Sequence, residues 1–382
     1  MSESLEGLRK KIDSIDDSIA KLYLERMDVA REIGDVKKQN QTEIDAPKRE
    51  NDILYRVLKQ ANSEKQKAYL KQLYEYVFSM SKMHQREGLE EHSKQIDNFR
   101  NALKNKKSSF PISASVACQG VEGAYSEIAA KKLFEVSNIT YFKTFESVFD
   151  AVDKGLCEYG VVPLENSTAG SVNQVYDLMR KNKFYVVKSI RLKVDHSLLA
   201  KKGTSLSDIK EVYSHEQAVN QCSNFISENK IKANICANTA VAAKLVASSD
   251  RTDIAAIASA KCAELYGLTA IASDIQNYSN NYTRFICISK NLEIYPGASK
   301  TSFMMTIPHV PGSLYSVISR FYALGINLVK IESRPLPDRD FEFMFYFDIE
   351  CSVYSDELIS LINELENDIT DFTYLGSYSE VM

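Results

Sequence analysis

Hydrophobic residues in the first forty positions recur at intervals of three and four. The series comprises Leu8, Ile12, Ile15, Ile19, Leu22, Val29, Ile33 and Val36. This spacing predicts a long helix with one apolar face of heptad type. A helix over about residues 4–38 would extend ~50 Å at 1.5 Å per residue, which is more than a small domain can cover. We therefore expect this face to pack against a second chain.

Arg26 interrupts the apolar series between Leu22 and Val29. A guanidinium turned toward a core is costly unless an anion meets it. Two further helices are predicted, one after Pro47 and one from about Gln66. Their polar residues could join Arg26 in a pocket for a small dianion, together with Arg9, Lys37, Arg49, Glu50, Ser81 and Gln85. The alternative is a solvated charged face, which we favour for Arg9 or Lys37 taken singly but not for Arg26.

Residues 86–112 are mostly charged and polar, and they end in a run of lysines and serines. The first part is predicted to prolong the third helix, which closes a helical domain over 1–95. Residues 96–112 are predicted to form a linker.

Short apolar runs then alternate with helical patterns. The runs lie at about 114–119, 139–145, 159–164, 185–192, 211–213, 233–237, 253–258 and 269–272, and the helical patterns at about 125–133, 171–180, 215–228, 239–247 and 260–266. This alternation predicts an α/β architecture with largely parallel sheets over 113–291.

Two motifs in this region place polar side chains at strand ends. Asn166, Ser167 and Thr168 follow the buried run at 159–164, and Ser126 opens a helix after another run. Thr283 and Arg284 begin the apolar run 285–288 directly after an Asn-Asn turn signal. A cleft would start at such an edge. The alternative is that Arg284 forms a salt bridge with a neighbouring carboxylate and Thr283 caps a loop.

The last segment, 299–382, has a simpler order of predicted strands and helices. Strands are predicted at 301–308, 327–333, 341–351 and 372–377, with helices at 312–323 and 355–366. This β-α-β-β-α-β order is typical of a ferredoxin-like α+β domain.

Composition limits the function. The chain has 382 residues, 44% of them hydrophobic and 26% charged, with a net charge of −4. These values predict a soluble protein of two or three domains and give no reason to expect nucleic acid or a membrane as partner. The seven cysteines show no C-x-x-C spacing, so we expect reduced core residues, no metal site and a cytoplasmic location. No dinucleotide or P-loop motif occurs, and no cofactor is expected.

The helical segment resembles the all-helical type of chorismate mutase. The resemblance lies in Leu8-Arg9-Lys10-Lys11-Ile12-Asp13, Glu25-Arg26, Lys37, Arg49-Glu50 and Ser81-Lys82-Met83-His84-Gln85. It implies an intertwined dimer in which Arg26 and Arg9 of the other subunit bind the two carboxylates of chorismate. Lys37 and Gln85 would meet the ether oxygen and Glu50 the ring hydroxyl, with Ser81 and Arg49 supporting the pocket. Many members carry an aspartate where this chain has Ala46, with Asp45 beside it.

The central region is similar to prephenate dehydratase. Four ordered motifs carry the resemblance: Gly120-x-x-Gly123-Ala124-Tyr125-Ser126, Asn166-Ser167-Thr168, Ser214-His215-Glu216-Gln217-Ala218 and Asn281-Tyr282-Thr283-Arg284-Phe285. It implies a fold of two lobes like a periplasmic binding protein, with lobe one at about 113–192 and 275–291 and lobe two at about 193–274. Prephenate would lie between the lobes, with Thr283 catalytic and Ser126, Asn166, Ser167, Thr168 and Arg284 as binding residues. The proton for the departing hydroxyl group would come from Thr283 itself or from a water or neighbouring group that Thr283 holds. Arg284 could instead be structural.

The last segment resembles the regulatory ACT domain of prephenate dehydratases. Its two signatures are Pro311-Gly312-Ser313-Leu314 and Glu332-Ser333-Arg334-Pro335. The resemblance implies that L-phenylalanine binds between subunits of a homodimer or homotetramer as a feedback inhibitor. Gly312, Ser313, Leu314, Asn327, Glu332 and Ser333 are the candidate effector residues, although Glu332 and Arg334 could serve the fold or an interface.

Together these patterns predict a bifunctional enzyme that converts chorismate to prephenate and prephenate to phenylpyruvate. Two alternatives remain open at this stage. One is a dehydratase with an inactive helical dimerisation arm, which Ala46 suggests. The other is an amino-acid sensor without catalytic activity.

Overall fold

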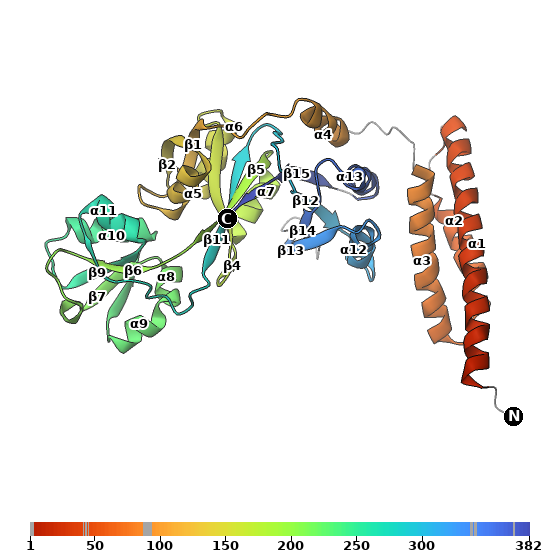
Figure 1. Cartoon of the computed structure of the whole chain (residues 1–382), viewed down its shortest axis with the longest axis horizontal. Coiled ribbons are helices and arrows are strands. Elements are labelled where there is room, and N and C mark those ends of the chain that lie inside the picture. Colours follow the sequence, from red (N-terminus) through yellow and green to blue (C-terminus); the bar gives the residue numbers. More distant parts are fainter. Residues whose placement is uncertain are drawn as a thin grey trace. The chain divides into compact units, whose positions relative to one another are not determined.

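The computed structural model describes residues 4–40, 42, 44, 46–86, 94–336, 339, 342–369 and 371–382. The chain divides into two compact units, Met1–His92 and Ser93–Met382. The first unit is helical, and the second combines sheets and helices (Figure 1).

Three helices are described in the first unit: α1 (Leu5–Asn40), α2 (Pro47–Leu58) and α3 (Glu64–Arg86). All three predicted helices are confirmed. Helices α1 and α3 approach each other closely at Gly34, where a Cβ atom would stand 2.7 Å from the backbone oxygen of Gln85. A larger residue at position 34 would therefore push apart the two helices that carry most of the predicted mutase residues.

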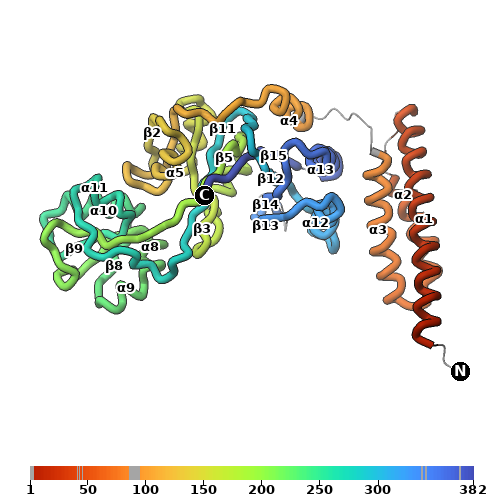
Figure 2. Tube along the Cα trace, in the orientation of Figure 1, coloured from red at the N-terminus to blue at the C-terminus, as the bar shows by residue number. Residues whose placement is uncertain are grey.

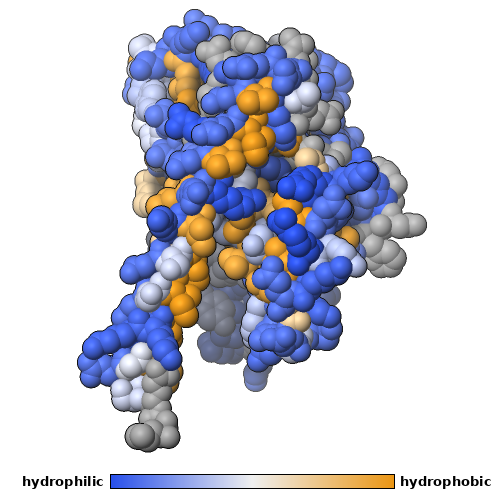
Figure 3. All heavy atoms as spheres, turned by 90° about the vertical axis from the view of Figure 1, so that its right-hand side faces the viewer, coloured by the Kyte–Doolittle hydropathy of each residue, from blue (hydrophilic) through white to orange (hydrophobic). Residues whose placement is uncertain are grey.

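The predicted apolar series of α1 faces away from this contact. Its eight residues each expose 45–64% of their surface, whereas Met27, Ala30 and Gly34 form the buried face toward α3. Hydrophobic side chains form a band along the helical unit (Figure 3). A continuous apolar surface of this kind marks an interaction site.

Lobe one of the second unit contains a seven-stranded sheet of order β16-β5-β11-β3-β1-β2, with β4 (Gly170–Ser171) paired to β3. Strand β1 (Ser113–Gln119) is parallel to β2 (Val136–Phe142) and β3 (Tyr159–Asn166). Strand β11 (Tyr282–Ser289) is antiparallel to β3 and to β5 (Tyr185–Lys193). The helices of the lobe are α5 (Tyr125–Leu133), α6 (Phe145–Asp153) and α7 (Asn173–Lys181). The prediction of largely parallel sheets is wrong for β11, because this strand returns from lobe two. It is also wrong for two strand pairs of the lobe-two sheet, those between residues 197–200 and 254–258 and between residues 197–200 and 269–272, which are antiparallel.

Lobe two contains a five-stranded sheet of order β10-β6-β9-β7-β8. Its strands are β6 (Ser197–Ala200), β7 (Glu211–Ser214), β8 (Lys232–Ile235), β9 (Ile254–Ala258) and β10 (Thr269–Ala272). Its helices are α8 (Glu216–Gln221), α9 (Ser223–Glu228), α10 (Thr239–Ser248) and α11 (Ala260–Tyr266), with a short 3₁₀ helix at Leu206–Asp208. The single helix predicted over 215–228 is divided at Cys222, and β6 was not predicted.

The chain crosses between the lobes twice, after β5 and before β11 (Figure 2). The two crossings are hydrogen-bonded to each other. The N–H of Ile275 donates to the carbonyl of His196 at 3.1 Å, and the N–H of Val194 donates to the carbonyl of Asn281 at 2.8 Å. The chain thus passes from the seven-stranded sheet to the five-stranded sheet after β5 and returns before β11.

The C-terminal domain has the predicted β-α-β-β-α-β order: β12 (Lys300–Ile307), α12 (Ser313–Ala323), β13 (Asn327–Pro335), β14 (Phe343–Glu350), α13 (Asp356–Asp368) and β15 (Thr373–Tyr378). Its antiparallel sheet has the order β13-β14-β12-β15. One further strand, β16 (Glu380–Val381), was not predicted. It leaves this domain and pairs with β5 at the edge of the lobe-one sheet.

Residues 96–112 are not simply a linker. Helix α4 covers Lys94–Lys104, and Ile96 and Phe99 expose only 2% and 1% of their surface in the core of the C-terminal domain. The side chain of Gln95 donates to the carbonyl of Phe372 at 2.7 Å and accepts from the N–H of Tyr374 at 2.7 Å. The prediction failed because two apolar residues in a polar segment carry little periodic signal. The predicted extension of the third helix lies outside the described residues.

Candidate active sites

A cluster of polar side chains lies between α1 and α3 in the helical unit. Arg26 donates to the hydroxyl of Ser81, and Lys37 donates to the side-chain oxygen of Gln85 at 3.3 Å. Lys37 also donates to the carbonyl of Ile44 at 2.6 Å. These contacts confirm that the residue breaking the apolar series faces polar groups of the third helix.

Glu50 on α2 forms a separate contact with α3. Its carboxylate lies 3.4 Å from the ammonium group of Lys82, the residue after Ser81. Partial burial lowers the pKa of Arg26 from its ordinary value, against the opposing influence of Tyr74 and Tyr23. Among the described residues, Arg26 is therefore a half-buried cation without a carboxylate in direct contact, as a site for an anionic ligand would contain.

Two predicted mutase residues do not join this cluster within the chain. Arg9 is exposed, and the 17 residues that separate it from Arg26 on α1 correspond to ~25 Å at 1.5 Å per residue. Arg49 is exposed on the first turn of α2. Ala46 precedes α2 and makes no side-chain cap, and Asp45 lies outside the described residues.

A second candidate site lies where the two lobes meet. An open cleft of about 500 Å³ is lined by Thr168, Ala169, His215, Glu216, Gln217, Asn220, Gln221, Asn277 and Tyr278. At its edge, Thr283 on β11 stands opposite Asn166 on β3 in the register of the sheet. The antiparallel pairing therefore brings together two motifs that are more than one hundred residues apart in the sequence.

The amide of Asn166 has its orientation fixed by the backbone. Its side-chain oxygen accepts from the N–H groups of Thr168 at 3.1 Å and Ala169 at 2.9 Å, and these groups can only donate. Its nitrogen consequently faces Thr283 and donates to the Thr283 hydroxyl oxygen at 2.9 Å. Because Thr283 accepts this bond, its own proton is left to be donated elsewhere.

Further side chains complete a polar network around Asn166. The Asn166 nitrogen donates to Asn281 at 2.8 Å, and the Thr168 hydroxyl donates to the Asn166 oxygen at 2.7 Å. Gln221 reaches across from lobe two and donates to the Thr168 hydroxyl at 2.9 Å and the Asn166 oxygen at 3.3 Å. Its own oxygen accepts from Asn281 at 3.0 Å and lies 2.9 Å from Nε2 of His196.

Gln221 and His196 were not predicted from the sequence to belong to this site. Neither residue belongs to a motif of recognisable spacing, and both reach the site only through the packing of the lobes. Asn281 was easier to identify from the sequence, because it lies two residues before Thr283 in the same motif. Its side chain is 1% exposed.

The other predicted dehydratase residues have different surroundings. Ser167 binds the neighbouring loop: its hydroxyl donates to the carbonyl of Asn280 at 3.0 Å and accepts from the N–H of Tyr282 at 2.9 Å. Ser126 is buried in the first turn of α5, beside Tyr125, whose ring lies edge-on to His196. The structure therefore brings Asn166, Thr168 and Thr283 together, with Ser167 in a supporting position.

Arg284 does not face the cleft with Thr283. Its side chain is 3% exposed and lies against the C-terminal domain, where it contacts Asp348 at 2.5 Å and Glu380 at 3.2 Å and donates to Tyr378 at 2.7 Å. It also contacts Glu165 at 3.3 Å. Burial alone would lower the pKa of Arg284, but the neighbouring acidic groups raise it above its ordinary value. The prediction of a substrate contact is corrected here, since successive residues of a strand face opposite sides.

Strand β13 of the C-terminal domain forms a second set of polar contacts with lobe one. Lys330 binds Glu165, and Glu332 accepts from the hydroxyl of Ser171 at 2.5 Å. Arg334 binds both carboxylate oxygens of Asp177 on α7, at 3.1 and 3.0 Å. Burial would raise the pKa of Glu165, but Lys330 and Arg284 bring it below its ordinary value.

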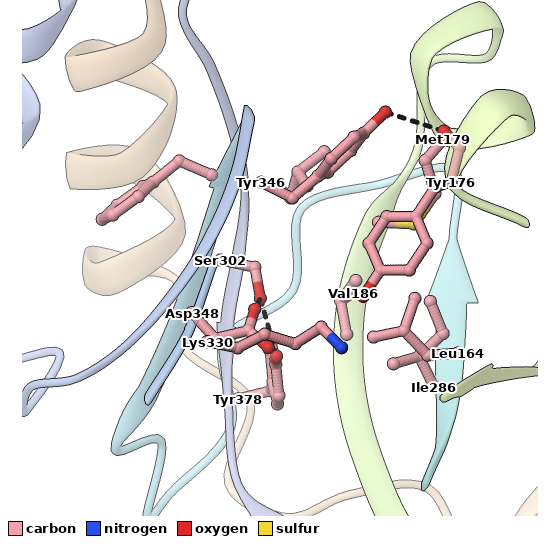
Figure 4. Close-up of a pocket in the computed structure, with 12 residues that line it drawn as sticks. Leu164, Tyr176, Met179, Val186, Ile286, Ser302, Lys330, Tyr346, Asp348 and Tyr378 are labelled. Carbon is pink, nitrogen blue, oxygen red and sulfur yellow. Dashed lines mark hydrogen bonds between the residues drawn. The ribbon is translucent and has the colours of Figure 1, made fainter. Parts of the chain in front are cut away.

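Apolar side chains fill the space between these polar contacts. Figure 4 shows Leu164, Val186 and Ile286 of lobe one facing Lys330, Asp348 and Tyr346 of the C-terminal domain. The enclosed space is about 10 Å³, roughly the room that one water molecule needs. Lobe one and the C-terminal domain therefore share a closely packed, charged interface.

The predicted effector residues lie on two elements, at the start of α12 and along β13. Gly312 adopts a positive φ of 90° at the start of α12, next to Ser313 and Leu314. Asn327 and Ser333 lie on the exposed face of β13, and Asn327 donates to Glu350 at 3.0 Å. Glu332 lies on the opposite face, toward lobe one, which favours the alternative role of this residue in the interface.

The part of the chain that the structure describes contains neither a candidate metal site nor a candidate membrane-spanning helix. No group of three or more His, Cys, Asp or Glu residues there could hold a metal ion. No helix there is both long and apolar enough to cross a membrane.

Comparison with known proteins gives matches in both units. The family model described as prephenate dehydratase matches residues 116–293, and that of chorismate mutase type II matches residues 8–86. The bifunctional chorismate mutase/prephenate dehydratase of Escherichia coli K12 is 30% identical over 98% of this chain and 96% of its own length. Arogenate dehydratase/prephenate dehydratase 2 of Arabidopsis thaliana is 37% identical over 69% of this chain and 72% of its own length.

A solved structure is similar to the second unit. Prephenate dehydratase from Arthrobacter aurescens, in complex with L-Phe, matches 69% of this chain and 89% of its own chain. The identity is 26% and the TM-score is 0.64.

Proposed function

The chain belongs to the family of bifunctional chorismate mutase/prephenate dehydratases, and from this premise we propose which of its residues carry out the two reactions. It converts chorismate to prephenate and prephenate to phenylpyruvate. The helical unit corresponds to the first activity and the two-lobed α/β domain to the second.

For the mutase reaction, Lys37 and Gln85 bind the ether oxygen of chorismate. The Claisen rearrangement needs no nucleophile, only a compact substrate conformer and positive charge where the breaking C–O bond becomes negative. The contact of 3.3 Å between the Lys37 ammonium group and the Gln85 amide oxygen supports this assignment, because it brings a cation and an amide together. Arg26 binds one substrate carboxylate, Glu50 binds the ring hydroxyl, and Ser81 and Arg49 support the pocket.

The second carboxylate of chorismate is bound by Arg9 of a second copy of the chain. Arg9 lies too far along α1 to reach the cluster of its own subunit. The exposed apolar face of α1 supports the same arrangement, because a parallel or antiparallel partner helix would cover it. We therefore propose that the enzyme is at least a homodimer and that its mutase site is shared between subunits.

For the dehydratase reaction, Thr283 donates the proton that the departing hydroxyl group of prephenate takes up. The C–C bond to the ring carboxylate breaks and releases CO2, and its electron pair forms the new ring double bond as the ring C–O bond breaks. The departing oxygen leaves as water with the proton from Thr283, and a proton from solvent then restores the Thr283 hydroxyl. The Asn166 N–H bond to the Thr283 oxygen stabilises negative charge on that oxygen during the transfer. Thr168 and Ser126 form further polar walls of the site, and Ser167 holds the loop.

The observation that carries this assignment is the fixed orientation of Asn166. Two backbone N–H groups determine which end of the amide faces Thr283, so Asn166 donates to the Thr283 oxygen and leaves the hydroxyl proton to be donated to the substrate. Incubation of the purified protein with chorismate should yield phenylpyruvate, detected by its alkaline ultraviolet absorbance. Accumulation of prephenate alone would contradict the dehydratase assignment. Unchanged chorismate would contradict the mutase assignment, and prephenate added to the same sample would then test the dehydratase by itself.

The C-terminal domain is an ACT domain that binds L-phenylalanine as a feedback inhibitor. The Arthrobacter aurescens relative in complex with L-Phe supports this proposal. Gly312, Ser313, Leu314, Asn327 and Ser333 form the effector site, near a second subunit. Calorimetric titration with L-phenylalanine should give saturable binding together with loss of dehydratase activity, and binding without inhibition would exclude a regulatory role.

The interface with lobe one gives the effector a route to the catalytic strands. Lys330 binds Glu165, which precedes Asn166, and Asp348 binds Arg284, which follows Thr283. A shift of β13 or β14 on effector binding would therefore act on the immediate neighbours of both catalytic side chains.

A further inference from the structure

His196 lies at the first crossing between the lobes, where its position is fixed by the backbone. Its N–H donates to the side chain of Gln276 at 2.9 Å, and its carbonyl accepts from the N–H of Ile275 at 3.1 Å. The side chain is 2% exposed, with the ring of Tyr125 packed edge-on at a centroid distance of 6.3 Å. The imidazole ring is thus held in place at this crossing, which we call the hinge, rather than in either lobe.

The tautomer of His196 follows from the network around Gln221. The Gln221 nitrogen donates to Thr168 and to the Asn166 oxygen, which the backbone has already made an acceptor. The Gln221 oxygen must then face His196, and Nε2 of His196 must carry the proton that bridges their 2.9 Å contact.

The other ring nitrogen has no hydrogen-bond partner among the described residues, although it is buried. Burial also lowers the pKa of His196, against the weaker influences of Gln221 and Asp195, so the ring is neutral. A buried acceptor without a partner is destabilising, and an apolar side chain of similar volume would avoid that cost. The hydrogen bond from Nε2–H to Gln221 is therefore the polar interaction that His196 makes and that an apolar side chain of similar volume could not make.

We propose that His196 is a positioning residue for the dehydratase reaction, acting through Gln221. With Asn281 it supplies the two donors that hold the Gln221 oxygen. Gln221 in turn joins lobe two to Asn166 and Thr168 in lobe one, so the hinge histidine orders the side chains that orient Thr283. This inference rests on the proposed role of Thr283.

Replacement of His196 by leucine tests the proposal. We expect His196→Leu to lower the kcat of dehydration about 10- to 100-fold, as small misplacements of reacting groups do, with little change in KM. Its thermal midpoint should equal or exceed that of the unchanged enzyme, because the unpaired Nδ1 is removed. Mutase activity, measured on the same preparation, should be unchanged.

Two further variants separate positioning from folding. His196→Gln keeps an N–H near the position of Nε2 and should restore most of the lost kcat. In a Gln221→Met enzyme, the additional His196→Leu change should cost little further, because the side chain through which it acts is gone. Equal losses in His196→Leu and His196→Gln, or fully additive losses with Gln221→Met, would overturn the proposal.

The proposed role of Thr283 can fail separately. If Thr283→Ala retained dehydratase activity, the mechanism would be wrong whatever His196 does. If Thr283→Ala were inactive and His196→Leu kept the original kcat, only the inference about His196 would be wrong. Should His196→Leu fail to fold, the comparison of His196→Gln with the unchanged enzyme decides, and a tenfold loss there would count against the proposal.

Discussion

The two candidate sites of this chain differ in how completely one subunit builds them. In the dehydratase site, Asn166, Thr168, Gln221 and Thr283 are joined by hydrogen bonds within a single chain. In the helical unit, Arg26 and Lys37 reach Ser81 and Gln85, but Arg9 is remote and the apolar face of α1 is exposed. The first cluster is a closed network of hydrogen bonds, whereas the second does not include the predicted Arg9 of its own chain.

This difference follows from the kinds of element that carry the residues. Adjacent strands fix the register of Asn166 and Thr283 through the backbone, so their side chains meet without help from another subunit. Helices of the first unit present long cationic side chains along their length, and a long helix needs a partner to bury its apolar stripe. We therefore expect the mutase to depend on assembly more strongly than the chemistry of the dehydratase does.

The largest effect is expected for Thr283→Val, which keeps the volume of the side chain and removes its proton. Dehydratase kcat should fall about 10²–10⁴-fold, the range typical of a lost general acid, while mutase activity is unchanged. Formation of phenylpyruvate and loss of chorismate are measured on the same sample. Thr283→Ser, which retains the hydroxyl, is the matched control and should keep much of the activity. Parallel loss of both activities would contradict two separate sites.

Lys37→Met should have the converse effect, which is a loss of mutase activity without a loss of dehydratase activity. Loss of the ammonium group should lower mutase kcat about 10²–10³-fold, by analogy with other donors to developing negative charge, and leave dehydration of added prephenate unchanged. Lys38→Met alters the next residue, which is exposed, and should have little effect. If the two substitutions were equivalent, Lys37 would not be the group that stabilises the ether oxygen.

The sequence was informative where local spacing reflects local structure. The heptad series located α1, its break located Arg26, and strand ends located Asn166 and Thr283. Long-range packing was not visible: Arg284 meets Asp348, 64 residues away, and Gln221 meets Thr168 across the cleft. Helix α4 was read as linker because Ile96 and Phe99 alone do not make a periodic pattern. Such contacts depend on how whole elements pack, which no short segment encodes.

A charge on the apolar face of α1 tests whether the mutase site is shared. Ile15→Asp should dissociate the helical interface, since a carboxylate would have to be buried there, and lower mutase activity at least about tenfold. Dehydratase activity should be affected less. Asp17→Lys also changes a charge, but on another face of α1, and should leave both assembly and activity intact. Sedimentation equilibrium gives the mass, and a fully active monomeric variant would show that one chain completes the site.

The smallest effect on either activity, but a clear effect on stability, is expected for Asp348→Asn. Asp348 is 7% exposed and binds the buried Arg284, so its neutralisation leaves a cation with reduced compensation. Removing one partner of an isolated buried pair costs about 3–5 kcal/mol, and a smaller loss is expected here because Glu380 and Glu165 still contact Arg284. Thermal unfolding should show this loss in the second unit alone, with mutase activity retained at temperatures where dehydratase activity is already lost.

Glu350→Gln, on the same strand but exposed, is the matched control and should shift the midpoint little. Equal midpoints for the two variants would mean that the interface between lobe one and the C-terminal domain does not hold the catalytic strand, and the proposed route for the effector would lose its support.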